Sequence, residues 1–337
     1  MENFFGGHGR LKPKRLETGD TIGILAPSSP PNDPATIDKG AAAVEKLGFK
    51  VKLAPNARAR HGYLAGSDKE RADDLMTLFA DKDVKAILCV RGGYGAMRLW
   101  DLLDYNVVRR NPKIFIGYSD ITSLHCAFQK KANLVTFHAP MAGAISSAEF
   151  PEFTKAAWLR TLTEAKPAGS LCAGYDKTGI STLHCGVAEG KLVGGNLSVF
   201  VSALGSNYLP SLKNKILFLE DVGERPYRLD RMLTQLLNAG VFEQVAGVAI
   251  GVNKDCEDKP EDANSNDGSA LDRAKFPAEY RQSSADVFAE RLSALKIPVV
   301  TGLPFGHVDL NAMIPVGAKA KLDGDNGDLI ITESAVS

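Results

Sequence analysis

Strand-like and helix-like segments alternate regularly from Thr21 to Phe137, and this alternation constrains the fold more than any other feature. The apolar, β-prone segments predict strands over 21–26, 49–53, 84–90, 114–117 and 134–137. The segments with helical spacing predict helices over 35–47, 69–79 and 96–103. This order predicts parallel βαβ units with helices on both faces of one sheet, and ligands bind such sheets beyond the carboxyl ends of the strands.

The alternation weakens after Pro151, and the later segments are shorter, richer in glycine and more β-like. Strands are predicted over 181–185, 186–195, 215–219, 245–252 and 299–300, helices over 196–204, 229–237 and 284–295, and a turn over 302–307. We therefore expect an α/β protein with a Rossmann-like or flavodoxin-like N-terminal domain (1–165), a linker (166–180) and a smaller β-rich α/β domain (181–337).

The bulk properties are those of an ordinary globular enzyme. The 337 residues contain 44% apolar and 24% charged side chains, and 40 Lys and Arg balance 40 Asp and Glu. A net charge of zero argues against a nucleic-acid or membrane partner. The five cysteines form no C-x-x-C pair, which argues against a zinc site or a disulfide framework. Neither a signal peptide nor a membrane-spanning run is evident, so we expect a cytoplasmic protein.

Ser119 stands between a predicted strand that ends at Gly117 and a helical pattern that runs through Leu124 and Phe128. A serine on such a turn exposes its hydroxyl at the sheet edge, beside the N–H groups of a helix N-terminus, and this geometry suits a nucleophile. The alternative is that Ser119 and Asp120 only cap the helix. The usual G-x-S-x-G motif is not matched, because Ile121 occupies the position of the second glycine.

A glycine-rich loop, Gly92-Gly93-Tyr94-Gly95, follows the strand predicted over 84–90. Glycine lets the backbone approach a substrate and point an N–H at its carbonyl, so this loop is a candidate oxyanion hole with the amide of Asp120 as second donor. A phosphate-binding loop and a plain tight turn are the alternatives. The loop fits neither G-x-G-x-x-G nor G-x-x-x-x-G-K-[ST].

A serine nucleophile needs a base and a carboxylate that orients the base. Among six histidines, His307 is the first choice because it follows the turn at Pro304–Gly306, and His138 is the second because it ends a predicted strand. Glu220, at the end of the strand predicted over 215–219, is the preferred carboxylate, with Asp221 as the alternative. Each of these side chains could also be purely structural.

Six short motifs, in order, resemble those of the LD-carboxypeptidase family of serine peptidases. They are Ala26-Pro27-Ser28-Ser29, Arg91-Gly92-Gly93-Tyr94-Gly95, Gly117-Tyr118-Ser119-Asp120, Gly194-Gly195-Asn196-Leu197, Leu219-Glu220-Asp221 and Gly306-His307. The resemblance implies Ser119 as nucleophile, Glu220 as acid, His307 as base, and oxyanion donors at the amides of Gly93 and Asp120. It also implies that the site forms at the junction of two domains, that the protein is a homodimer, and that no metal or organic cofactor is used.

The muropeptide branch of that family cleaves the amide between a diamino acid and the terminal D-Ala of a peptidoglycan tetrapeptide. The alternative branch contains microcin C self-immunity peptidases, which cleave a toxic aminoacyl-nucleotide. An interpretation from another class is a non-catalytic, two-lobed binding protein. Two departures affect the choice of branch: Ala139 stands where family members often have glycine, and a polar segment, 254–270, resembles an insertion.

Overall fold

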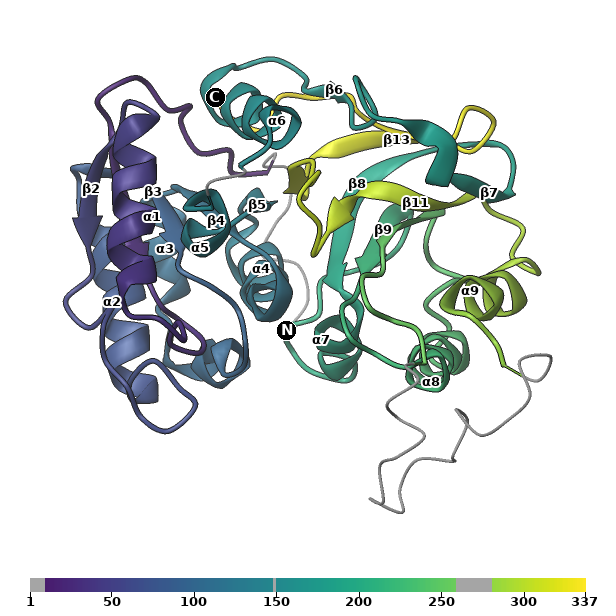
Figure 1. The fold of residues 1–337 in the computed structure, drawn as a ribbon, viewed down its shortest axis with the longest axis horizontal. Helices are drawn as coiled ribbons and strands as arrows, with labels where there is room; N and C mark the ends of the chain where they lie inside the picture. The colour runs from purple at the N-terminus through teal and green to yellow at the C-terminus, as the bar shows by residue number, and fades with distance from the viewer. Residues whose placement is uncertain (1–9, 148–149, 259–280) are drawn as a thin grey trace.

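The protein is built on two β-sheets that lie side by side (Figure 1). The structure is a computed structural model, and it describes residues 10–147, 150–258 and 281–337. Most of the N-terminal half forms one sheet with its helices, and most of the C-terminal half forms the other. The predicted fold class, a parallel α/β part followed by a β-rich part, is confirmed.

The first sheet has the strand order β12-β5-β4-β3-β1-β2. Five of its strands are parallel, as the alternation predicted, and the sixth is antiparallel. The parallel strands are β1 (Thr21–Leu25), β2 (Lys50–Leu53), β3 (Val84–Cys89), β4 (Ile114–Gly117) and β5 (Thr136–His138), and the antiparallel one is β12 (Ile314–Val316). Because β12 comes from the C-terminal half, the two halves share this sheet.

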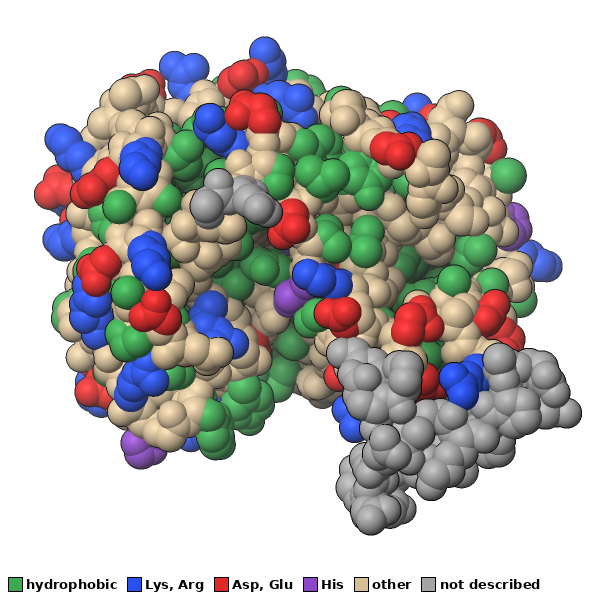
Figure 2. All heavy atoms as spheres, in the orientation of Figure 1, with side chains coloured by type: hydrophobic (Ala, Val, Ile, Leu, Met, Phe, Trp, Pro, Cys, Tyr) green, Lys and Arg blue, Asp and Glu red, His purple; other side chains and the backbone are tan. Residues whose placement is uncertain are grey.

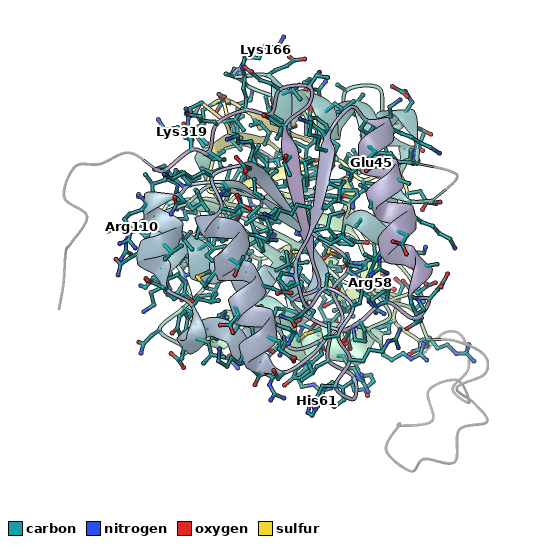
Figure 3. The ribbon with its side chains drawn as sticks, turned by 90° about the vertical axis from the view of Figure 1, so that its left-hand side faces the viewer. Glu45, Arg58, His61, Arg110, Lys166 and Lys319 are labelled. Atoms are coloured by element: carbon teal, nitrogen blue, oxygen red, sulfur yellow. The ribbon has the colours of Figure 1, made fainter. Side chains whose placement is uncertain are left out.

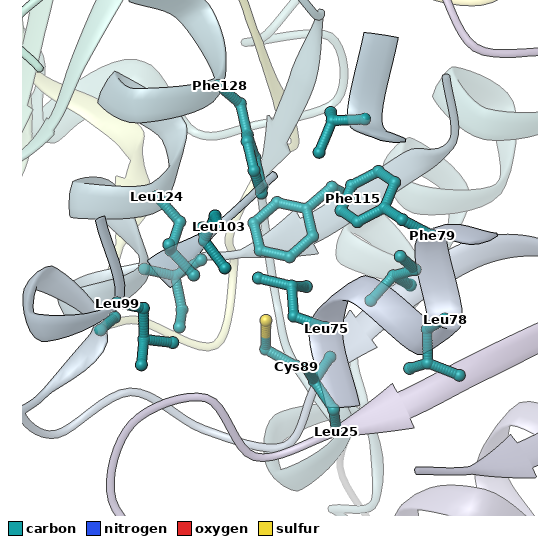
Figure 4. Close-up of a cluster of buried hydrophobic side chains, with 14 of the residues drawn as sticks. Leu25, Leu75, Leu78, Phe79, Cys89, Leu99, Leu103, Phe115, Leu124 and Phe128 are labelled. Carbon is teal, nitrogen blue, oxygen red and sulfur yellow. The ribbon is translucent and has the colours of Figure 1, made fainter. Parts of the chain in front are cut away.

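Helices cover both faces of the first sheet. One face is covered by α2 (Asp68–Ala80), the 3-10 helix η1 (Ala96–Leu102), α3 (Tyr105–Arg110), α4 (Thr122–Ala127) and the π-helix η3 (Phe128–Ala132). The other is covered by α1 (Ala35–Lys46), α5 (Ala142–Ile145) and α6 (Glu152–Thr163). In the first of these layers Phe79 of α2 packs against Phe115 and Phe128 (Figure 4). Burying one such side chain stabilises the fold by about 1.5–3 kcal/mol.

The second sheet has the order β6-β14-β13-β8-β9-β10-β11-β7. Its parallel centre consists of β8 (Val187–Asn196), β9 (Lys215–Glu220), β10 (Gly247–Val252) and β11 (Val299–Gly306). Antiparallel strands flank it: β6 (Gly169–Ser170), β7 (Ser181–His184), β13 (Lys319–Asp323) and β14 (Asp328–Ile331). The helices described in the C-terminal half are the 3-10 helix η4 (Lys177–Gly179), α7 (Leu197–Ser202), α8 (Pro226–Asn238) and α9 (Ser284–Leu292).

The two sheets meet where β8 ends beside α4. A Cβ on Gly195 would lie 2.3 Å from the Thr122 Oγ1, so only glycine allows this approach. The Thr122 hydroxyl accepts a hydrogen bond of 2.9 Å from the backbone N–H of Asn196. This contact joins α4, which begins just after Ser119, to β8, which pairs with β9 and brings Asn196 opposite Glu220.

One predicted element is wrong. The segment predicted as a short strand and a separate turn, 299–307, forms one strand, β11, that runs to Gly306. Glycine and proline at 302, 304 and 306 favoured a turn, but pairing with β10 continues past them through two register shifts. Of the predicted polar loop 254–270, residues 259–270 lie outside the described part of the chain.

All five cysteines lie in the described residues, and none is bonded to another. No helix in the described ranges is long and apolar enough to cross a bilayer.

Candidate active site

Ser119 has a backbone conformation that is rare for a side-chain-bearing residue. Tyr118 alone separates it from β4. Ser119 has a φ of 63° and opens the 3-10 helix η2 (Ser119–Ile121) that leads into α4. Left-handed conformations of this kind cost about 1–3 kcal/mol and persist where the surrounding structure enforces them, often at functional sites. The sharp strand-to-helix turn predicted at Ser119 is therefore present, and we call this turn, residues 117–121, the elbow.

The glycine loop approaches the serine closely. A Cβ on Gly92 would lie 2.8 Å from the Ser119 Cβ and 3.0 Å from its Oγ, so any side chain at position 92 would collide with the serine. The same Cβ would lie 3.2 Å from the backbone nitrogen of Asp120. The next residue, Gly93, has a φ of 114°. The loop that the sequence suggested as an oxyanion hole thus lies directly against the elbow.

The Asp120 side chain holds this loop in place, a role that the sequence analysis missed because it considered the side chain only as a possible helix cap. The buried carboxylate accepts hydrogen bonds from the Ser28 hydroxyl at 2.7 Å and the Ala96 N–H at 2.8 Å. Burial raises the pKa of Asp120, and these two donors oppose the rise. The carboxylate therefore connects three chain segments at one point.

Arg71 was also missed. This buried residue of α2 donates from one nitrogen to the carbonyls of Pro27 at 2.5 Å and Gly95 at 2.9 Å. It shares a helix face with Leu75 and Leu78, which belong to the core. A charged residue at helical spacing from apolar residues was the signal that could have identified it.

The predicted acid and base are in contact. The His307 Nδ1 lies 2.7 Å from the Glu220 Oε2, and the Glu220 side chain is fully buried. The second oxygen of Glu220 has no hydrogen-bond partner among the described residues. A carboxylate that accepts the Nδ1 proton favours the tautomer whose Nε2 is free to accept another proton.

The His307 ring also packs against the elbow, the turn that contains Ser119. Its ring lies 4.7 Å, centroid to centroid, from that of Tyr118, the residue before Ser119. Burial, with the nearby Glu220 carboxylate, raises the pKa of Tyr118 to about 12, which keeps the phenol neutral. Tyr118 and His307 line one pocket of about 130 Å³ together with Asp309. Figure 2 shows that this face of the molecule is hollowed between the two halves.

Asp221, the alternative acid, has a different role. Its carboxylate accepts hydrogen bonds from the Asn196 side chain and the Ser198 backbone, each at 2.9 Å, and so fixes the start of α7. Burial raises the pKa of Asp221 to about 6. Of the two neighbouring carboxylates, the one that bonds to His307 is Glu220.

The other described histidines are less suited to act as base. His138, the second choice, is fully buried, and burial lowers its pKa well below the usual value. Neither of its ring nitrogens has a hydrogen-bond partner among the described residues. His125 is buried between Thr136 and the carbonyl of Gly117, with its pKa lowered by burial to about 4. His61 lies on an exposed loop at the periphery (Figure 3).

Within the described ranges, no three or more His, Cys, Asp or Glu side chains gather in a way that could hold a metal ion. His307 and the buried Glu220 form the kind of imidazole–carboxylate pair that serine hydrolases use, and the His307 ring lies beside Tyr118, the residue before Ser119.

The chain belongs to the LD-carboxypeptidase family. Residues 22–139 match the family's N-terminal domain, which includes Ser119, and residues 189–322 match its C-terminal domain, which includes Glu220 and His307. The resemblance inferred from the six motifs is confirmed, and family membership favours a peptidase over a non-catalytic binding protein.

Relatives from both branches of the family are similar over nearly the whole chain. A probable murein peptide carboxypeptidase of Bacillus subtilis is 37% identical over 97% of this chain and 95% of its own. A murein tetrapeptide carboxypeptidase of Pseudomonas aeruginosa is 32% identical over 84% of this chain and 86% of its own. The structure of MccF in complex with glutamyl sulfamoyl guanosine is 26% identical, with a TM-score of 0.82, and covers 97% of this chain and 100% of its own.

Proposed function

We propose that the protein is a serine-type LD-carboxypeptidase with Ser119 as nucleophile, His307 as base and Glu220 as the carboxylate that orients the base. The observation that carries the proposal is the 2.7 Å contact between His307 and the buried Glu220, beside the elbow on which Ser119 lies. The amides of Gly93 and Asp120 are the proposed oxyanion donors. The proposal requires no metal and no organic cofactor.

The proposed reaction has two halves. The Ser119 oxygen attacks the amide carbonyl while the His307 Nε2 accepts its proton, and the oxyanion lies against the two amides. The imidazolium, stabilised by Glu220, then gives that proton to the leaving amine, which departs and leaves an acyl-enzyme. Water attacks the ester through the same base, and the acid product and the free serine are released.

The proposed substrate is a muropeptide tetrapeptide, cleaved between its diamino acid and its terminal D-Ala. Two of the relatives carry murein peptide carboxypeptidase names, which supports this choice. A carboxypeptidase must also bind a free carboxylate, and Arg91 precedes the loop that touches Ser119. Among the residues that the structure describes, its guanidinium makes two long hydrogen bonds, 3.3 Å each, to the carbonyl oxygen of Pro30 and the side-chain oxygen of Asn32. We assign the substrate's terminal carboxylate to Arg91.

Product analysis tests this function. The purified protein is incubated with L-Ala-D-Glu-meso-diaminopimelate-D-Ala, and the products are identified by mass spectrometry. We expect free D-Ala and the tripeptide, and neither from the Ser119→Ala variant. Release of D-Ala by that variant at the wild-type rate would reject the mechanism, whereas an intact tetrapeptide after incubation with folded wild-type protein would reject the substrate.

The second candidate function is cleavage of an aminoacyl-nucleotide of the microcin type. Two exposed aromatic side chains favour it: Tyr94, in the glycine loop, and Tyr63 lie 5.8 Å apart between ring centroids and are 54% and 65% exposed. Exposed aromatic rings can stack on a nucleobase. Faster hydrolysis of glutamyl sulfamoyl adenosine than of the tetrapeptide, with loss of this preference in Tyr94→Ala, would favour the second function over the first.

We also propose that the protein is a cytoplasmic homodimer with two domains, 1–165 and 181–337, joined by the segment 166–180. A recycled tetrapeptide is a cytoplasmic substrate, which is the reason for the proposed location. Light scattering coupled to size-exclusion chromatography tests the dimer: we expect about twice the 36.1 kDa mass of one chain. Elution as a 36.1 kDa species would contradict it.

A further inference from the structure

A row of three lysines crosses the second sheet far from the active site. Lys319 of β13 pairs with Lys191 of β8, and Lys191 pairs in turn with Lys215 of β9. Residues directly opposite on neighbouring strands point to the same face, with Cβ atoms about 5 Å apart. Like charges placed in this way repel each other and destabilise a sheet. The arrangement therefore needs a reason.

Nearby cations strengthen the repulsion. Arg10 acts electrostatically on both Lys191 and Lys215, and one of its terminal nitrogens, Nη1, is buried with no hydrogen-bond partner in the described residues. Burial, together with Arg10, Lys191 and Lys130, lowers the pKa of Lys215 to about 7. Burial is also the main cause that lowers the pKa of Arg10 to about 10. These are signs of cations held close together and partly out of water.

Carboxylates do not balance this cluster. Across the described part of the chain, none forms an ion pair with Lys191, Lys215 or Lys319. Glu333 pairs with Lys12 at 3.1 Å and accepts the backbone N–H of Lys319 at 2.7 Å. Glu189 also borders the row. The positive charge exceeds what these two acids can neutralise.

The row lines a cavity. The three lysines, with Lys213 and Glu189, line an open pocket of about 390 Å³, which is the size of a small-molecule site. Figure 3 shows Lys319 at the upper left periphery of the molecule and His61 at the bottom. Lys215 and Glu220 stand at opposite ends of β9, about 17 Å apart at the rise of a β-strand, so the cavity is separate from the catalytic groups.

We propose that this cavity binds a small, multiply charged phosphate anion, of the diphosphate class. A monovalent carboxylate can neutralise only one member of a row whose ends lie about 10 Å apart. A diphosphate carries several charges spread over oxygens that can reach neighbouring ammonium groups, and lysine binds phosphate as a compact charge. The anion can be free pyrophosphate or the diphosphate of a nucleotide, and these share the same chemistry.

Calorimetry and thermal unfolding, with pyrophosphate as the probe, test the site. At constant ionic strength we expect saturable binding to the wild-type protein and a rise in its Tm. The double variant Lys191→Met/Lys215→Met should bind at least tenfold more weakly. Its Tm without anion should equal or exceed that of the wild type, because the repulsion is gone. Lys46→Met, at the exposed end of α1, is the matched control and should bind like the wild type.

Two results of the pyrophosphate titrations would reject the proposed anion site. Absence of saturable binding to the wild type, or equal affinity in the double variant, would overturn it. If the double variant does not fold, Lys319→Met, on the exposed end of the row, takes its place with the same criteria. A parallel titration with ADP distinguishes the two sources: tighter binding of ADP than of pyrophosphate identifies a nucleotide site, and the reverse order identifies a site for the free anion.

Discussion

Position 92 can hold only glycine if Ser119 is to keep its place, because a Cβ there would lie 2.8 Å from the Ser119 Cβ. We expect Gly92→Ala to lower kcat/KM for D-Ala release at least 100-fold, since displacing a nucleophile by about 1 Å can cost that much. Circular dichroism should show an unchanged fold. The matched control is Gly179→Ala, where an added Cβ meets no atom within 4 Å. Equal activity of the two variants would contradict the assigned geometry.

Arg91 gives the second test at the residue scale. If its guanidinium binds the terminal carboxylate, Arg91→Met should raise KM and lower kcat/KM about 10- to 100-fold, which corresponds to a lost charge-assisted hydrogen bond of about 1.5–3 kcal/mol. A tetrapeptide that ends in D-alaninamide lacks this charge, so the same substitution should change its hydrolysis little. Arg91→Lys should restore part of the activity. Equal losses on both substrates would show that Arg91 has only a structural role.

At the scale of elements, the Asp120 carboxylate connects the elbow to the loop that contains Ser28 and to the start of η1 at Ala96. Asp120→Ala would leave the buried Ala96 N–H and the Ser28 hydroxyl without their acceptor. We expect unfolding free energy to fall by about 2–3 kcal/mol in denaturant titrations, because buried polar groups that lose their partners are costly. The control Asp73→Ala, which removes an exposed ion pair, should change it by less than about 1 kcal/mol. If Asp120→Ala lowers the free energy of unfolding no more than the control does, the Asp120 carboxylate does not hold these segments together.

Helices and strands were easier to predict from the sequence than contacts between residues distant in the chain. Alternating patterns were sufficient to predict the parallel strands of the first sheet, since apolar runs and helical spacing are local properties. The continuation of β11 was not predictable, because Gly302 and Pro304 favour a turn locally and only pairing with β10 keeps them in a strand. For the same reason the roles of Arg71 and the Asp120 side chain, which depend on segments distant in sequence, were missed.

At the scale of the whole molecule, two buried imidazoles make the fold sensitive to acid. Burial lowers the pKa of His125 to about 4 and that of His138 well below its usual value. An unfolded chain takes up these protons near pH 6.5, whereas the folded chain does not, so stability is lost as the pH falls from 6.5 toward 4. Each group contributes up to about 1.4 kcal/mol per pH unit. Denaturant titrations from pH 7 to 4.5 should show this decline.

A pair of variants isolates the contribution of one imidazole. His138→Leu removes a buried ring and should flatten the decline of stability in acid, whereas His61→Leu, at an exposed position, should leave the slope unchanged. If the two variants follow the same slope, His138 is not a source of the acid sensitivity.

In the proposed mechanism the two halves of the molecule contribute different members of one catalytic unit, Ser119 from the first and Glu220 with His307 from the second. The most direct test is kcat/KM for D-Ala release by Ser119→Ala, Glu220→Ala, His307→Ala and the triple variant. Residues that act as a unit are strongly non-additive. We therefore predict that kcat/KM falls at least about 1,000-fold in Ser119→Ala and in His307→Ala. The kcat/KM of the triple variant should be no lower than that of the less active of these two single variants. Losses that multiply in the triple variant, or a His307→Ala variant within tenfold of the wild type, would contradict the account.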